Sequence, residues 1–368
     1  MSFSDIFCQD RAVNTLQRAY ASNRAAHAYI FAGPEGVGKF KTACEWARLL
    51  LCSEPVTKDN FAEACGRCES CRLFSADSHP DFNHIYKELR EFTEEGKDKP
   101  PPVELPIDVI REFLIEKATI KPGVSRKKVF IISEAEKLNV NSQNALLKIL
   151  EEPPLYCCII LICTRLDVLL PTIRSRCQIV RFGPVQKERI IQKLRLLGLD
   201  EVRCGYFARM AQGSIGSACQ WAALELADAN LYQVKQEIIK SLADYRLADV
   251  LELADEILDK SKKIAEVWSS VEEKKSRLDL TRKAAQMLIM MVISALYDVT
   301  RKDICPAEEA LNCDQFQLIE KLAGRLDRQV CMEKIADCYQ MLHWVESSVN
   351  ERLIWEHLLL NLAESGTI

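Results

Sequence analysis

Four cysteines at short spacing give the clearest chemical signal in the sequence. Cys65, Cys68 and Cys71 are each separated by two residues, and Cys52 lies thirteen positions earlier. Four thiolates can hold a zinc ion tetrahedrally at about 2.3 Å each. Because sulfur would fill all four positions, the predicted role of the zinc is structural.

The fourth ligand is the least determined. Cys52 ends a predicted helix, where it could belong to the core, and Cys44 or His79 could replace it. We predict Cys52 as the ligand and interpret His79, which precedes a proline, as a residue that orders its loop. The alternative to a metal site is a set of buried free cysteines. This is disfavoured because the turn 65–71 is polar and few apolar residues lie near it in the sequence.

A second pattern is typical of a loop that binds phosphate groups. Gly33, Gly36, Gly38 and Lys39 follow a predicted strand and precede a predicted helix over residues 41–51. In such a loop the backbone N–H groups, the start of the helix and the lysine all favour an anion. The sequence therefore predicts a loop that descends from the phosphate-binding loops of nucleotide hydrolases.

The residues that would hold magnesium beside this loop are missing. The position after the lysine is Phe40 instead of Ser or Thr, and Thr42 is about 200° further around the helix. The predicted strand 129–132 ends in Ser133-Glu134, where a hydrolase has Asp-Glu. We therefore predict no ATP hydrolysis, and the sequence leaves open whether the loop still holds a nucleotide.

Composition limits the kinds of partner. With 49 Lys+Arg against 53 Asp+Glu, the 368-residue chain has a net charge of −4, so any nucleic-acid contact must be local or belong to a partner. The N-terminus has no basic stretch followed by an apolar run, and apolar runs such as 157–163 are too short to cross a bilayer. We expect a cytoplasmic protein with no membrane contact.

Strands and helices are predicted to alternate up to about residue 183, and only helices are predicted after it. We expect three domains over residues 1–183, 184–229 and 230–368. Residues 87–105, charged and then rich in proline, are interpreted as an exposed loop without core contacts. The basic cluster within 121–128 is interpreted as a solvated turn that could also touch phosphates.

Several segments together resemble bacterial clamp-loader subunits of the AAA+ class, which serve DNA polymerase III. The match is dense over residues 5–183 and thin afterwards. It rests on the phosphate-binding loop, the cysteine cluster and four further segments, 27–29, 79–81, 144–153 and 170–177. The resemblance implies an α/β AAA+ P-loop core with a parallel sheet and an inserted zinc module (about 52–71), then a small helical lid and an all-α C-terminal collar.

The resemblance also implies roles for single residues. Arg176, in the segment Ser-Arg-Cys, would act as a finger on ATP bound by an adjacent motor subunit. Thr164, at the end of a strand, would lie where the γ-phosphate is sensed, and Glu134 would lie beside the phosphates. Motor subunits carry an arginine where this chain has Gly216. The alternative for Arg176 is an ion pair with a carboxylate of its own domain.

The leading hypothesis is a non-hydrolysing stator subunit in a five-membered ring with motor subunits and a delta subunit. It would meet the sliding clamp and primed DNA through that complex, with structural zinc as its cofactor. One alternative is an active ATPase motor subunit of the same complex. Another is a zinc-ribbon protein that binds nucleic acid, which the acidic balance and the lack of aromatic residues near 65–71 disfavour.

Overall fold

The computed structural model describes residues 3–58, 61–94, 96, 102–244, 246–272, 277–347 and 349–364. The chain forms two compact units. The first comprises residues 1–186 together with 213–216, and the second comprises residues 187–212 and 217–368. The division into three domains is not tested by this result and stays a prediction.

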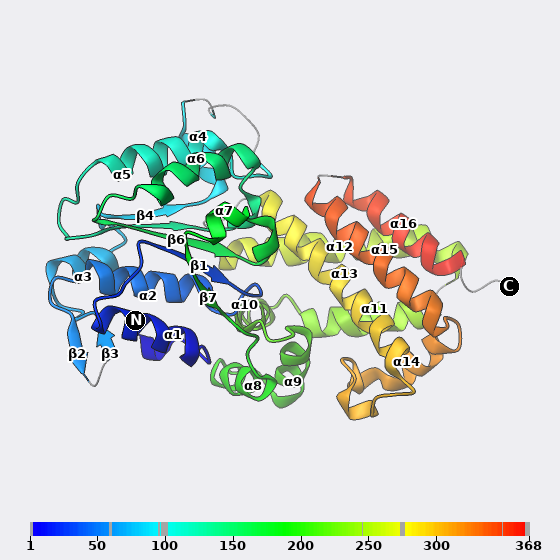
Figure 1. Cartoon of the computed structure of the whole chain (residues 1–368). Helices are drawn as coiled ribbons and strands as arrows, with labels where there is room; N and C mark the ends of the chain where they lie inside the picture. Colours follow the sequence, from blue (N-terminus) through cyan, green and yellow to red (C-terminus); the bar gives the residue numbers. More distant parts are fainter. Residues whose placement is uncertain are drawn as a thin grey trace. The chain divides into compact units, whose positions relative to one another are not determined.

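A five-stranded parallel sheet lies at the centre of the first unit (Figure 1). Its order is β4-β5-β6-β1-β7, so β1, the first strand of this sheet in the sequence, lies between two of the last. The strands are β1 (Ala28–Ala32), β4 (Phe82–Ile85), β5 (Lys128–Ile132), β6 (Cys157–Cys163) and β7 (Gln178–Arg181). The order reverses at β1, and ligands of open parallel sheets bind at such switch points, beyond the carboxyl ends of the strands.

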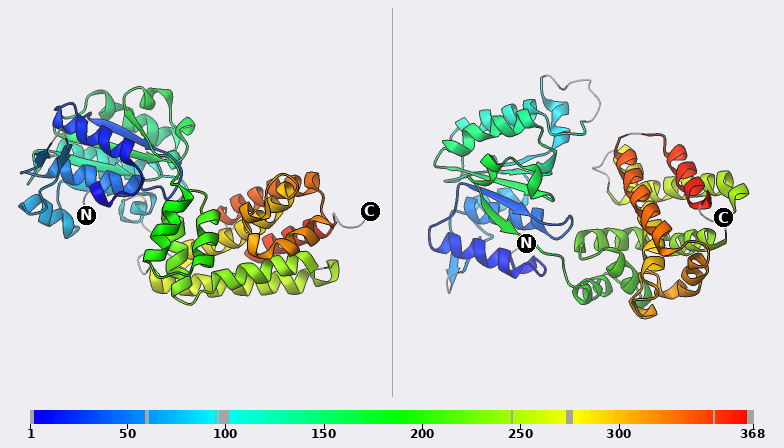
Figure 2. Two further views of the ribbon diagram at one scale, coloured as in Figure 1. Left: turned by 90° about the horizontal axis from the view of Figure 1, so that it is seen from below. Right: turned by 45° about the vertical axis from the view of Figure 1, so that its right-hand side comes forward.

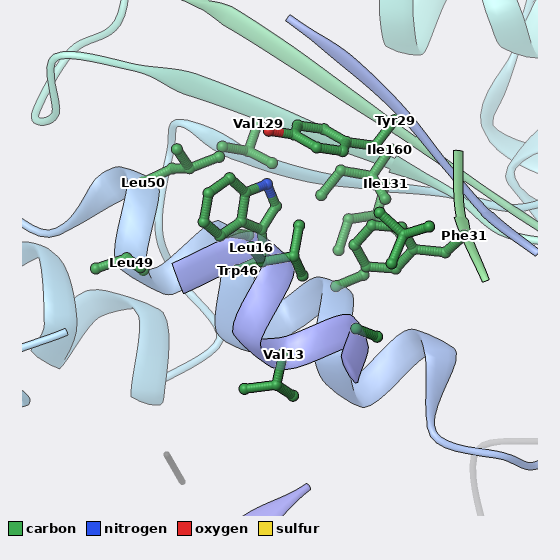
Figure 3. Packing of buried hydrophobic residues seen from close by; sticks show 14 of the residues in the cluster. Val13, Leu16, Tyr29, Phe31, Trp46, Leu49, Leu50, Val129, Ile131 and Ile160 are labelled. Carbon is green, nitrogen blue, oxygen red and sulfur yellow. The ribbon is translucent and has the colours of Figure 1, made fainter. Parts of the chain in front are cut away.

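Helices cover both faces of the sheet, because alternate side chains of each strand point to opposite faces. Tyr29 and Phe31 of β1 pack on one face with Trp46 and Leu16, as Figure 3 shows. Ala28 and the other even-numbered residues of β1 pack on the opposite face. The first face is covered by α1 (Asp10–Ala21) and α2 (Lys39–Leu51), and the second by α4 (Ile107–Ile110) and α6 (Val140–Glu151).

Shorter elements complete the first unit. A two-stranded hairpin and a short helix follow α2 and carry the cysteine-rich segment: β2 (Val56–Lys58), β3 (Phe61–Glu63) and α3 (Glu69–Ser75). The remaining elements are η1 (Phe3–Asp5), η2 (Lys87–Phe92), the π-helical turn η3 (Arg111–Glu116), α5 (Lys117–Thr119), η4 (Ala135–Lys137), η5 (Leu166–Val168) and α7 (Pro171–Arg174).

The interpretation of residues 87–105 as a loop without core contacts is wrong for the part that the structure describes. Residues 87–92 form η2, and Leu89 packs against the core cluster of the second sheet face. Thr93 is buried and its hydroxyl donates to Asp108 at 3.0 Å. Leu105 is also buried and pairs with Leu138. Residues 95 and 97–101 lie outside the described part.

The second unit is helical (Figure 2). Its long central helix α13 (Arg277–Arg301) packs against α12 (Val250–Val271) and α15 (Arg328–Glu346). Length and composition would let α13 cross a membrane, but 72% of its apolar window is buried inside the protein. The other helices are α8 (Lys187–Leu196), α9 (Glu201–Met210), α10 (Ile215–Leu226), α11 (Leu231–Asp244), η6 (Leu247–Asp249), η7 (Ala307–Glu309), η8 (Cys313–Gln315), α14 (Phe316–Ala323) and α16 (Glu351–Glu364).

Candidate functional site

The four predicted cysteine ligands come together in the structure. The sulfur atoms of Cys52, Cys65, Cys68 and Cys71 all lie within 4.8 Å of one another. Cys52 Sγ is 3.6 Å from Cys65 Sγ and 3.9 Å from Cys68 Sγ. Sulfurs bound tetrahedrally at about 2.3 Å to one zinc ion lie about 3.8 Å apart. The cluster could therefore hold a zinc ion.

Helix ends and backbone donors position these sulfurs. Cys52 caps the C-terminus of α2, and Cys68 caps the N-terminus of α3. The backbone N–H of Cys65 donates to Cys52 Sγ at 3.3 Å, that of Cys68 to Cys65 Sγ at 3.3 Å, and that of Cys71 to Cys68 Sγ at 3.4 Å. Such donors stabilise the negative charge of a thiolate, which is the form that binds a metal.

The two alternative ligands lie outside the cluster. Among the described residues, neither Cys44 nor His79 has a ligand atom in it. His79 Nε2 is 2.8 Å from Ser70 Oγ and 3.2 Å from Ser125 Oγ. Both hydroxyls donate to the carbonyl oxygen of Leu51. The imidazole therefore orders the chain beside the cluster, which agrees with the interpretation of His79.

The lysine of the phosphate-binding loop folds back onto the loop itself. Lys39 Nζ donates to the carbonyl oxygens of Gly33 at 2.6 Å and Pro34 at 2.5 Å, and the residue is buried. Burial lowers the pKa of Lys39, while the negative charge of Glu136 opposes that shift. Gly38 begins the helix with φ 100°, a conformation that favours glycine. Two of the three ammonium protons are thus directed at the chain's own carbonyls.

A second contact closes the loop from the chain segment 213–216. The Gly216 N–H donates to the carbonyl oxygen of Gly36 at 2.7 Å. A Cβ at position 216 would lie 3.0 Å from both the Cα and the carbonyl oxygen of Gly36, so glycine permits this approach. The residue that replaces the expected motor-subunit arginine therefore also brings this segment onto the loop.

The two positions that lack magnesium ligands belong to one cluster of contacting side chains, which we call the His84 cluster: Phe40, which is 43% exposed, and the partly buried His84, Tyr86 and Ser133. The His84 ring lies 4.7 Å from the ring of Phe40 and 4.9 Å from that of Tyr86. His84 Nε2 is 2.8 Å from Ser133 Oγ. Burial lowers the pKa of His84 to about 4, so the imidazole is neutral at neutral pH. The sequence prediction missed His84, because it follows no motif spacing.

Glu134 and Thr164 follow the carboxyl ends of β5 and β6, as predicted, but each contacts another residue. Glu134 has φ 50° and forms an ion pair with Lys137 at 2.7 Å. Thr164 Oγ1 donates to Glu136 Oε1 at 2.5 Å. Glu136 is therefore the acidic residue that contacts Thr164 and acts on Lys39. Sequence reasoning missed Glu136, because it considered only the carboxylate directly after position 133.

Arg176 follows α7 and lies partly in solvent. Its Nη2 is 2.8 Å from Glu151 Oε1, and its Nη1 donates to the carbonyl oxygen of Thr172 at 3.0 Å. The ion pair within its own domain, the alternative considered from the sequence, is thus present in this chain. The side chains of Arg176 and Glu151 are 36% and 50% exposed, and exposed pairs of this kind contribute about 0.2–1 kcal/mol.

Comparisons with known proteins agree with this architecture. The family model of "DNA polymerase III, delta subunit" matches residues 8–186. DNA polymerase III subunit delta′ of Pseudomonas aeruginosa is 39% identical over 155 residues, which cover 41% of this chain and 42% of that protein. Subunit delta′ of Bacillus subtilis is 26% identical over 362 residues, which cover 97% of this chain and 96% of that protein.

A subunit of another type is also similar. DNA polymerase III subunit tau of Bacillus subtilis is 29% identical over 314 residues, covering 84% of this chain and 45% of that protein. The matches to the Pseudomonas aeruginosa delta′ and to tau thus span less than half of those proteins. The family match and the named delta′ relatives, one of them similar over nearly its whole length, lead to one conclusion. Together they support a delta-prime-type clamp-loader subunit of DNA polymerase III.

Proposed function

We propose that this chain is a non-hydrolysing stator subunit of a sliding-clamp loader, and that Arg176 acts on ATP held by a neighbouring motor subunit. The observation that carries the proposal is the state of the loop lysine. Lys39 is buried and directed at its own carbonyls, and the neighbouring position 40 is aromatic. Arg176, in contrast, is partly exposed and is held by one exposed ion pair and one hydrogen bond to a backbone carbonyl oxygen.

In this role the guanidinium group of Arg176 neutralises charge that develops on the transferred phosphoryl group. To do so it leaves Glu151, which costs at most about 1 kcal/mol for an exposed pair, and the carbonyl oxygen of Thr172. A phosphate then replaces the carboxylate as the anionic partner, and the planar guanidinium can bind its oxygens with two parallel hydrogen bonds. Arg176 is the catalytic residue that this chain contributes.

The names of the relatives support the proposed partners. This chain would assemble with motor subunits and a delta subunit in a ring of five, in the cytoplasm. Residues 184–229 would form a lid, and the helices within 230–368 would form the collar that holds the ring together. The sliding clamp and primed DNA would be met through the complex, because the net charge of −4 gives the chain no overall attraction for DNA.

Reconstitution tests this proposal. The chain is mixed with motor and delta subunits, and the mass of the product is measured. We expect a stable complex that contains all three kinds of subunit, and no ATPase activity from this chain alone. Absence of this chain from the complex contradicts the proposal.

We also propose that the four-cysteine cluster binds one structural zinc ion per chain. The sulfur spacing fits the ion, and four thiolates leave no coordination position open for water. Metal analysis of the purified protein should give one zinc per chain, and Cys65→Ser should remove it. Cys44→Ser is the matched control, because Cys44 lies outside the cluster, and it should keep the zinc. Zinc-free wild-type protein contradicts this proposal.

The second candidate function is an active motor subunit of the same complex. The similarity to tau over 84% of this chain favours it. A motor subunit differs from a stator subunit in that it hydrolyses ATP with magnesium. Turnover by the isolated chain at about 1 per second or faster, as is usual for enzymes, establishes this candidate and excludes the stator.

A further inference from the structure

His84 occupies an unusual position between the two missing magnesium ligands. In a nucleotide hydrolase of this layout, the hydroxyl after the loop lysine and the carboxylate after the strand converge on one metal ion. Here the residues at those positions, Phe40 and Ser133, both contact His84 instead. The ring centroids of Phe40 and His84 are 4.7 Å apart, and His84 Nε2 lies 2.8 Å from Ser133 Oγ.

His84 contacts two aromatic rings and one hydroxyl group. The Phe40 ring and the Tyr86 ring, at 4.7 and 4.9 Å, pack against the imidazole. Aromatic pairs at such distances contribute about 0.5–1.5 kcal/mol beyond the area they bury. Nε2 has the Ser133 hydroxyl as its hydrogen-bond partner. The imidazole therefore has protein partners at its ring and at Nε2.

From this geometry we infer that His84 fills the magnesium position between residues 40 and 133 and excludes the metal by itself. The inference rests on the proposed non-hydrolysing function and deepens it, since three residues and not two separate this site from an active one. The magnesium that the fold family implies does not fit the side chains present here. A hydroxyl and an aromatic ring offer no charge to the ion, and the imidazole takes its place.

Placing a carboxylate at position 133, without other changes, should strengthen the exclusion of the metal ion by His84. In Ser133→Asp the new carboxylate lies beside the imidazole, and an opposite charge at such a distance favours protonated histidine. The imidazolium then neutralises the carboxylate that would otherwise bind the metal. A divalent cation would have to displace that positive charge.

Manganese binding tests the inference. The probe is Mn²⁺ alone, without nucleotide, and binding is followed by paramagnetic broadening of the amide signals of residues 131–135. The comparison is between Phe40→Thr/Ser133→Asp and the same protein with His84→Ala added. We expect the triple variant to bind Mn²⁺ at least about tenfold more tightly, the scale on which groups around a metal site change its affinity. Equal affinity, or no binding by either protein, overturns the inference.

A second measurement applies if the multiple variants fail to fold. In Ser133→Asp alone, the His84 imidazole is titrated by nuclear magnetic resonance. We expect its pKa to rise from the wild-type value of about 4, because the new carboxylate favours the protonated imidazole. A pKa unchanged from that of the wild type overturns the inference. The proposed stator function is tested separately, by ATP hydrolysis in reconstituted complexes that carry changes at Arg176. Failure of that function can therefore be distinguished from failure of the inference about His84.

Discussion

The phosphate-binding loop and the Arg176 segment lie in the same unit, yet they hold their basic residues in opposite ways. In the loop, Lys39 is buried and its ammonium group donates to two carbonyl oxygens of the loop. Gly216 approaches the same loop through a 2.7 Å hydrogen bond. Arg176, by contrast, is 36% exposed and is held by Glu151, which is 50% exposed.

The two regions therefore differ in the free energy needed to free their basic side chains from the present contacts. Opening the loop requires the hydrogen bonds of Lys39 and Gly216 to break, and leaving a buried donor or acceptor unpaired costs about 1–3 kcal/mol. Releasing Arg176 requires the exposed ion pair with Glu151 to separate, at less than about 1 kcal/mol. Its exposed hydrogen bond to the carbonyl oxygen of Thr172 must also break, at about 0.5–1.5 kcal/mol. A ligand of the loop would therefore first have to displace these internal contacts, whereas in our proposal Arg176 exchanges its carboxylate for an external anion.

Gly216→Ala tests the closure of the loop and should have the largest effect on stability. The added Cβ meets backbone atoms of Gly36 at 3.0 Å, so the loop must shift. We expect the opening free energy of β1, measured by amide hydrogen exchange, to fall by about 1–3 kcal/mol. Gly123→Ala is the matched control, because a Cβ there meets nothing within 4 Å. Equal exchange in both variants contradicts the close approach.

Acid should destabilise the protein through His84. Its pKa is about 4 in the folded chain and about 6.5 when unfolded. Between these values the unfolded state binds more protons, so the free energy of unfolding falls as the pH drops from about 6.5 to about 4. The contribution of His84 at pH 5 is a loss of about 2 kcal/mol.

The measurement is urea unfolding of wild type and His84→Gln at about pH 7.5 and about pH 5. Glutamine cannot titrate, so the loss on acidification should be smaller in the variant by about the contribution of His84. Other groups, such as the buried His79, titrate in both proteins and cancel in this comparison. If both proteins lose the same stability, the burial of a neutral imidazole at position 84 is wrong.

Glu151→Gln should have the smallest effect. It removes the charge that pairs with Arg176 and keeps the size of the side chain. We expect the free energy of unfolding to change by less than about 1 kcal/mol, measured by urea unfolding. A larger loss shows that the pair is a firm structural contact, and Arg176 would then be poorly suited to leave it.

Much of the fold could be predicted from the sequence, because the strands of a parallel sheet are short apolar runs. The strand predicted at 129–132 corresponds to β5, and the four-cysteine cluster was found from spacing alone. Residues 87–105 were misjudged, since charged and proline-rich composition hides single buried side chains such as Leu89 and Leu105.

The contacts of the candidate site could not be predicted in the same way. His84 contacts Ser133 and Glu136 contacts Thr164, and in each pair the two residues are far apart in the sequence. No motif links them, so only the folded structure reveals these contacts. The loss of a hydroxyl at position 40 and of a carboxylate at position 133 was visible in the sequence. That a single imidazole contacts both positions was not, because it depends on the pairing of β4 with β5.

The most direct test of the account is Arg176→Ala in the reconstituted complex, with Arg174→Ala as the control on the same segment. Zinc content, folding and assembly should be unchanged. At the ATP site that faces this subunit, single-turnover hydrolysis should slow by about 10³-fold or more, as for arginine fingers in GTPases. Arg176→Lys should restore only part of the rate, because an ammonium group lacks the planar two-pronged contact. Normal assembly together with an unchanged hydrolysis rate in Arg176→Ala would contradict the account and leave this subunit a scaffold.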